Sequence, residues 1–242
     1  MGLLSIVYNC ALPSDNYQPA GIFNGKILLT DNTTPLYNPS FSDEEWLALN
    51  KAARIRFLAL NLATGDLETL EKDFSAWSES GHYVTDGFYY FHRYAEEDVY
   101  HHESNLYEWN LNTQKETAVA EDLKNHVILF EFLLDGKVIY KKNEVILSPN
   151  GTVDVKYHGF YWCDTATGET EEMGLYREVA WETEDSDVSY KELVRPLADA
   201  GEYYLVVSNT TMSEEGLFEQ KSLILKEDYW ARKANYIPIT ML

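Results

Sequence analysis

The chain has 242 residues, 45% of them hydrophobic and 14% aromatic, enough to bury the core of one larger β domain or two small ones. Its 40 Asp and Glu outnumber 19 Lys and Arg, which gives a net charge of −21. A field of that sign repels phosphate groups, so direct binding to nucleic acid or to an anionic membrane is disfavoured. A solvated acidic surface is favoured over a dedicated cation-binding face.

The N-terminal residues 3–8 form an apolar run that predicts a strand. Residues 1–10 lack a basic start and a small-residue cleavage site, so they make a poor signal peptide. Either the protein is cytoplasmic or an export signal lies outside this sequence. No apolar run reaches the length of a membrane-spanning helix. Cys10 and Cys163 make no disulfide framework, so two free thiols are expected, with a single disulfide as the alternative.

A turn glycine followed by an apolar, aromatic-rich strand occurs four times along the chain. The turn glycines are Gly25, Gly87, Gly136 and Gly201. They are 62, 49 and 65 residues apart, and the shortest interval is close to the length of one repeat unit.

An aromatic hairpin follows each of the first three glycine turns, at 56–68, 106–117 and 160–171. Asn61, Asn110 and Asp164 open the hairpin turns, because Asn and Asp side chains accept a hydrogen bond from their own backbone two residues on. Glycine supplies the positive φ at the end of two of these turns, at Gly65 and Gly168. Gln114 takes its place in the middle copy.

A further strand precedes the next glycine, at 126–132 in one unit and at 178–181 in another. Four strands in about 50 residues is the period of a β-propeller blade. We therefore predict an all-β fold, a propeller-like array of about four four-stranded blades in a single domain over 1–242. The blades start near 25, 87, 136 and 201, and the strand at 3–8 is a candidate to complete the last one. The ring is then small and closed, or partial, with edges that need a partner.

Two short helical inserts are predicted, and they lengthen the first and last intervals between the turn glycines. Residues 42–45 (Ser-Asp-Glu-Glu) form a capping box that predicts a helix to about Ala53. Residues 189–192 (Ser-Tyr-Lys-Glu) predict a shorter helix, which Pro196 interrupts.

Two polar clusters are the candidates for a metal site. The denser one holds Glu96, Glu97, Asp98, His101 and His102, but its spacing matches neither an EF-hand loop nor an H-E-x-x-H helix. Asp185 and Asp187 could contribute to a structural Ca²⁺ site, although the central Gly and distal Glu of a Ca²⁺ loop are missing. Solvated acidic loops are favoured, so we predict no metal and no cofactor, with structural Ca²⁺ as the alternative.

No catalytic residue is predicted, because the chain has no G-x-S-x-G elbow and no phosphate-binding glycine loop. Trp109 and Trp162 occupy equivalent hairpin positions, which favours core packing between neighbouring blades. Trp46, on the first helical insert, is the candidate for an exposed ligand-binding aromatic.

The hairpin turns at 63–66 (Ala-Thr-Gly-Asp) and 166–169 (Ala-Thr-Gly-Glu), with the Asp-Gly strands, resemble those of TolB-like and DUF5050-like bacterial β-propeller proteins. The tail at 226–230 and 235–238 is similar to the end of such proteins. This resemblance implies an exported lipoprotein of gut Firmicutes, extracytoplasmic or on the cell surface, without an assigned activity. Those families usually have about six to eight blades, against the four expected here.

The repeated turns without a catalytic motif predict a non-enzymatic binding or scaffold module that presents propeller loops to a protein, peptide or glycan. One alternative is a propeller hydrolase that acts on glycans through paired carboxylates. The other is an acidic decoy that binds a basic or nucleic-acid-binding protein.

Overall fold

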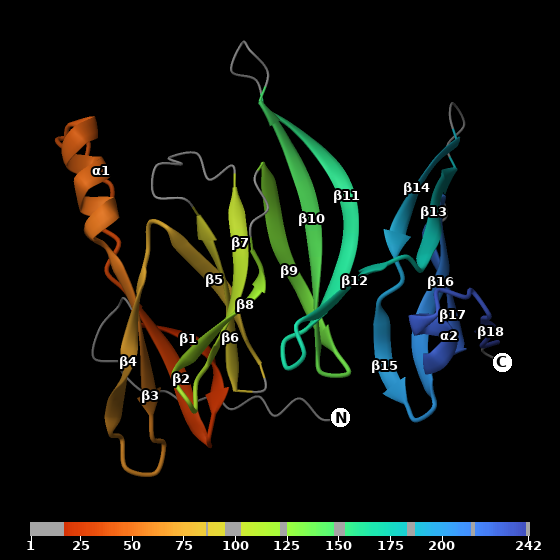
Figure 1. Ribbon diagram of the computed structural model, residues 1–242, viewed down its shortest axis with the longest axis horizontal. Helices are drawn as coiled ribbons and strands as arrows, with labels where there is room; N and C mark the ends of the chain where they lie inside the picture. Colours follow the sequence, from red (N-terminus) through yellow and green to blue (C-terminus); the bar gives the residue numbers. More distant parts are fainter. Residues whose placement is uncertain are drawn as a thin grey trace.

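The computed structural model of the chain describes residues 17–85, 87–94, 103–121, 125–147, 153–182, 187–213 and 216–240. Most of these residues lie in β-strands, which form sheets that stand side by side in a row (Figure 1). The strand predicted at 3–8, and Cys10, lie outside the described residues.

The first sheet is four antiparallel strands in chain order. We call it the first unit; its strands are β1 (Tyr17–Phe23), β2 (Lys26–Asn32), β3 (Arg54–Leu60) and β4 (Leu67–Ser75). The helix α1 (Asp43–Ala52) is inserted between β2 and β3 and projects from one end of this unit (Figure 1).

The next sheet contains two further four-stranded units, which meet where Ser104 of one pairs with Val127 of the other. The second unit is β5 (Glu79–Thr85), β6 (Phe88–Tyr94), β7 (Ser104–Asn110) and β8 (Lys115–Ala120). The third unit is β9 (His126–Leu134), β10 (Lys137–Leu147), β11 (Val153–Asp164) and β12 (Glu169–Met173).

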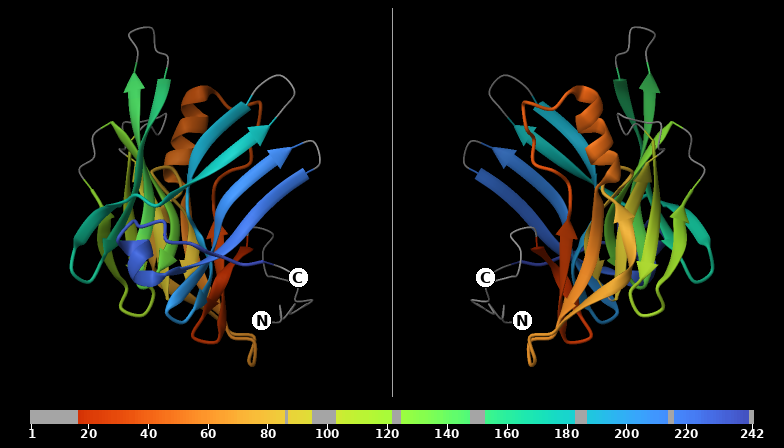
Figure 2. Two further views of the ribbon diagram at one scale, coloured as in Figure 1. Left: turned by 90° about the vertical axis from the view of Figure 1, so that its right-hand side faces the viewer. Right: turned by 90° about the vertical axis from the view of Figure 1, so that its left-hand side faces the viewer.

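The last sheet holds a fourth unit and one additional hairpin. The last unit is β15 (Pro196–Ala200), β16 (Tyr203–Ser213), β17 (Gly216–Leu225) and the two-residue β18 (Ile237–Pro238), with α2 (Lys226–Trp230) after β17. The extra hairpin is β13 (Tyr176–Glu182) and β14 (Asp187–Leu193). β13 pairs in parallel with β16, and Figure 2 shows the extra hairpin lying beside β16 and β17.

The predicted all-β, propeller-like array is confirmed by this strand order. Each predicted turn glycine joins the first two strands of its unit with a positive φ, from +73° at Gly25 to +81° at Gly87. The units in the structure therefore begin one strand before the glycine, near 17, 79, 126 and 196. The first and last units lie at opposite ends of the row, so the described residues form an open array (Figure 1).

The hairpin turns have the predicted chemistry in all three copies. The side chains of Asn61, Asn110 and Asp164 each accept a hydrogen bond from the backbone two residues on, at 2.9 Å. Gln114 has φ +56° where the other copies have glycine, so the turn geometry is kept even with a side chain at that position. The repeat is therefore set by backbone geometry, which Asn and Asp stabilise locally.

The first predicted helix is confirmed and the second is wrong. Ser42 and Glu45 form the reciprocal capping box of α1, and the hydrogen bonds from the Ser42 backbone and hydroxyl lower the pKa of Glu45. Residues 187–193 form β14 instead of a helix, and their backbone pairs with β13 from Tyr176↔Leu193 to Glu182↔Asp187. Pairing with a non-local strand outweighs the weak local preference for a helix.

Buried side chains fill the spaces between successive units, where the core lies. The first and second units share Phe57, Phe74 and Trp109, and the third and last units share Trp162 and Tyr204. Trp109 is 0% exposed and Trp162 is 6% exposed, so the predicted core role of both is confirmed. Each small sheet thus shields its neighbour's apolar face from water.

Cys163 is a buried free thiol in the core between the second and third units. Burial raises its pKa, which keeps the thiol protonated and unreactive at neutral pH. Neither helix in the described part of the chain is long and apolar enough to cross a membrane.

Candidate functional site

A cleft of about 430 Å³ lies between the third unit and the extra hairpin. We call it the hairpin cleft; it is lined by Glu131, Lys141, Phe160, Arg177, Glu192, Leu193 and Arg195. Its volume falls in the range of about 300–1,000 Å³ that is usual for sites that bind small molecules. Its walls come from segments about 60 residues apart in the sequence, from β9 to the link after β14.

Charged side chains dominate the lining of the hairpin cleft. Three of the chain's 19 Lys and Arg residues lie there, together with two carboxylates. The local balance of formal charge is therefore positive in a protein whose net charge is −21. Charges gathered in a concave site act more strongly than charges spread on a convex surface, because the protein walls exclude water.

A β-bulge in β9 positions the carboxylate of Glu131. Phe132 pairs with Ile139 and Phe130 pairs with Tyr140, so Glu131 is the extra residue between them. The bulge breaks the alternation of the strand, and Arg195 contacts two consecutive residues, Glu131 at 2.8 Å and the ring of Phe132 at 4.7 Å. Bulges commonly redirect a side chain beside a functional site.

The opposite wall is built on Arg177, which is directly across from Glu192 in the extra hairpin. Its Nε and Nη2 donate to one oxygen of Glu192, at 3.2 and 2.5 Å, and its Nη1 donates to Thr210 on β16, at 2.7 Å. Arg177 has only 15% of its side chain exposed, whereas Glu192 has 45%. Arg177 therefore fixes Glu192 at the rim and ties the extra hairpin to the last unit.

Burial shifts the titration of Glu131. Loss of water around the carboxyl raises its pKa, and the nearby charges of Arg195 and Lys141 offset this only in part. The hairpin cleft can therefore both donate and accept hydrogen bonds. Guanidinium donors lie on one wall, and carboxylate acceptors lie on both walls.

A second, smaller cavity of about 260 Å³ lies between the first and second units, near the glycine turn. Most of its polar lining is engaged within the protein, although Oε1 of Gln114 is buried without a hydrogen-bond partner among the described residues. The amide of Asn24 donates to that of Asn112 at 3.1 Å, and Lys26 pairs with Glu68 at 2.5 Å. It offers fewer charged groups to a ligand than the hairpin cleft does.

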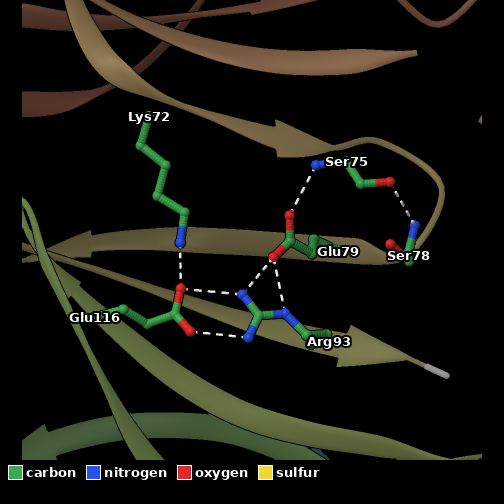
Figure 3. Close-up of polar contacts among 6 residues, drawn as sticks. All are labelled: Lys72, Ser75, Ser78, Glu79, Arg93 and Glu116. Carbon is green, nitrogen blue, oxygen red and sulfur yellow. Dashed lines mark hydrogen bonds and ion pairs between the residues drawn. The ribbon is translucent and has the colours of Figure 1, made fainter. Parts of the chain in front are cut away.

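A network of ion pairs joins the first unit to the second (Figure 3). Arg93 binds Glu79 through Nε and Nη2, at 2.9 and 2.6 Å, and Glu116 through Nη1 and Nη2, at 2.8 and 3.0 Å. Lys72 of the first unit completes the network by pairing with Glu116. Two positive and two negative groups balance one another, so this network connects two units and offers no open site.

Glu116 should stabilise the fold near neutral pH and lose this effect in acid. Burial raises its pKa, but hydrogen bonds from Arg93 and Lys72 outweigh this and lower it below the ordinary value. The resulting stabilisation is present above the pKa of about 4.3 in the unfolded chain and is lost as pH falls through the lower folded value. We expect the difference in unfolding free energy between wild type and Glu116→Gln to be largest near pH 6 and to shrink below about pH 4. Urea unfolding between those pH values measures it; a constant difference would contradict the assignment.

All but one of the predicted metal-site residues lie outside the described residues, so metal binding by them stays a prediction. Glu96, Glu97, Asp98, His101, His102 and Asp185 lie outside the described residues, and Asp187 begins β14. Within the described ranges, no group of three or more His, Cys, Asp or Glu side chains is placed to hold a metal ion.

Trp46 lies on α1 and is half-buried. Its ring packs edge-on against Tyr37, with centroids 5.5 Å apart, and is stacked with Phe41 at 6.4 Å. Tyr37 and Phe41 cover part of the ring, so only part of the Trp46 surface that was predicted to bind a ligand is open to solvent. The role of Trp46 in ligand binding stays a prediction.

The residues that line the hairpin cleft were not predicted from the sequence. Arg177 and Glu192 become neighbours only when 187–193 is a strand, and the helix predicted there hid this pair. One pattern was available: Val188 and Tyr190 alternate with Ser189 and Lys191, as in a half-exposed strand. No comparable pattern in the sequence indicates the bulge at Glu131.

No protein-family model and no curated protein matches the chain. Among solved structures, it is similar to oligogalacturonate lyase from Vibrio parahaemolyticus, with 14% identity and a TM-score of 0.47, over 93% of this chain and 55% of that one. It is also similar to an oligogalacturonate lyase in complex with manganese, with 11% identity and a TM-score of 0.34, over 62% and 50% of the two chains. The chain spans about half the length of each. The strand order and pairing of the four units define the propeller-like fold.

Proposed function

We propose that the protein is a non-enzymatic binding module that holds part of a glycan or peptide in the hairpin cleft. The observation that supports this is a concave site of about 430 Å³ with charged groups of both signs on opposing walls. Arg177 and the bulge at Glu131 fix these groups before any ligand arrives. Groups held in place in advance lose less conformational entropy on binding.

Binding should depend on the charged lining. We expect Lys141→Met to weaken ligand binding by about tenfold, because it removes one cation and keeps the apolar stem of the side chain. Lys115→Met is the matched control, since Lys115 is exposed on β8 of another unit. Arrays of oligosaccharides and peptides, followed by calorimetry on the best ligand, measure the effect. Equal binding by both variants would place the ligand elsewhere.

The direction of the pKa shift at Glu131 favours one alternative, a glycan hydrolase, because burial also raises the pKa of the general acid in many glycosidases. The same oligosaccharides, incubated with the protein and analysed for new reducing ends, decide between the two functions. If the wild type cleaves a sugar and Glu131→Gln does not, the protein is an enzyme and the proposed binding function is wrong. Intact sugars after prolonged incubation support the binding module.

The acidic-decoy hypothesis stays a prediction that concerns the net charge of −21 and not the hairpin cleft. A decoy should capture basic proteins at low salt and release them at high salt. Lys141→Met, which makes the charge more negative, would then strengthen capture instead of weakening binding.

A further inference from the structure

We infer that the ligand held in the hairpin cleft is an acidic sugar, a glycan unit that carries a carboxylate beside its hydroxyl groups. This inference rests on the proposed binding function. Some hydrogen-bonding atoms of the cleft are used within the protein, and others have no partner among the described residues. The chemistry of the second group indicates the ligand.

Arg195 provides the donors for the carboxylate. Of its five N–H groups, only those on Nη2 face a hydrogen-bond acceptor in the described part of the chain, the Glu131 carboxylate at 2.8 Å. Nε and Nη1 have no acceptor among the described residues. The guanidinium is held over the ring of Phe132 at 4.7 Å, and its side chain is 55% exposed. A planar fork held in one place with donors to spare suits bidentate binding of a carboxylate.

The carboxylates of the cleft provide acceptors for hydroxyl groups. Arg195 uses one oxygen of Glu131, and Arg177 uses one oxygen of Glu192. The other oxygen of each, Oε1, receives no hydrogen bond from the described residues. These oxygens can accept hydrogen bonds from a ligand in place of water, because a carboxylate has about four sites for hydrogen bonds.

Electrostatics favours a ligand with one negative group over a neutral one. Lys141, Arg177 and Arg195 outnumber Glu131 and Glu192 among the residues that line the cleft, so the lining attracts a ligand with one carboxylate. A ligand with several adjacent negative charges would instead be repelled by the two carboxylates and by the net charge of −21.

A sugar satisfies this combination better than an acidic peptide does. A sugar ring presents hydroxyl donors on successive carbons, whereas an extended peptide presents one backbone N–H about every 3.3 Å, alternately on opposite sides. The apolar side chain of Phe160 also lines the cleft, and an aromatic ring can pack against the C–H face of a sugar.

The test uses three probes in calorimetric titrations of the full chain: a trisaccharide that contains one uronic acid, the same sugar with the carboxyl group reduced to an alcohol, and a tri-glutamate peptide. We expect the acidic trisaccharide to bind about tenfold more tightly than its reduced form, because charged hydrogen bonds are lost on reduction. The peptide should bind more weakly than either sugar.

The variant Arg195→Met should remove this preference, so that acidic and reduced trisaccharides bind equally. Arg195→Lys should keep part of it, since the charge remains but the fork is lost. Lys115→Met is the control and should leave the tenfold ratio unchanged. Thermal unfolding of each variant verifies that the fold is intact.

The outcomes separate the two proposals. Tight binding of the reduced sugar, or of the peptide, with sensitivity to Lys141→Met would keep the hairpin cleft as a binding site and overturn the acidic sugar as its ligand. If neither the trisaccharides nor the arrays give binding that depends on Lys141, the binding function fails as well.

Discussion

Replacing Trp109 with alanine should lower the free energy of unfolding by about 3–5 kcal/mol. Trp109 is fully buried between the first and second units, and its ring lies 5.2 Å from Phe74 and 5.7 Å from Phe57, centroid to centroid. The cavity left by the substitution is lined by both units, so it weakens the contact that shields each sheet from water. The midpoint and slope of urea unfolding, followed by circular dichroism, measure the loss.

Two matched variants make this prediction specific. Trp109→Phe should cost clearly less, because it fills part of the space and because the Nε1 of Trp109 has no hydrogen-bond partner in the described residues. Trp46→Ala, on the half-buried face of α1, should also cost less than Trp109→Ala. A loss for Trp109→Ala no larger than that for Trp46→Ala would contradict the packing of units against each other.

Replacing Arg93 with methionine should cost about 2–3 kcal/mol, less than the 3–5 kcal/mol typical of a fully buried pair because Arg93 is 34% exposed. The substitution leaves Glu79, with only 10% of its side chain exposed, without its cation. It also removes two of the bonds that hold Glu116, which Lys72 of the first unit binds. The loss is therefore expected both within the second unit and at its junction with the first.

A double variant tests this cause. Adding Glu79→Gln to Arg93→Met should restore part of the stability, because it removes the charge that was left unpaired. Lys26→Met is the control for an exposed pair: its partner Glu68 is 63% exposed, so a change below about 1 kcal/mol is expected. If Arg93→Met and Lys26→Met proved equally mild, the network would contribute no more than an ordinary surface ion pair.

Short-range interactions explain which features of the fold were predictable. The turns at Asn61, Asn110 and Asp164 depend on hydrogen bonds that span two residues, and the start of α1 depends on a contact between Ser42 and Glu45. Such contacts form between residues that are neighbours in the sequence, so they do not depend on the rest of the fold. The regular recurrence of these turns was sufficient to predict four-stranded units and the burial of a tryptophan at the equivalent hairpin position.

The candidate site could not be predicted in the same way, because its parts meet only through pairing of distant strands. Residues 189–192 have a local pattern of a helix start, yet β14 forms because β13 supplies backbone partners along its whole length. The bulge at Glu131 results from the register between β9 and β10, which single residues do not encode.

The sequence by itself determined the repeat, its turns and the side chains that fill the space between units, since these depend on contacts within one turn or on burial of large apolar groups. The tertiary structure decided the extra hairpin, the order in which it joins β16, and the meeting of Arg195 with Glu131 across 64 residues of chain. Contacts over such separations become favourable only after the intervening chain has folded, because the entropy of loop closure must first be overcome.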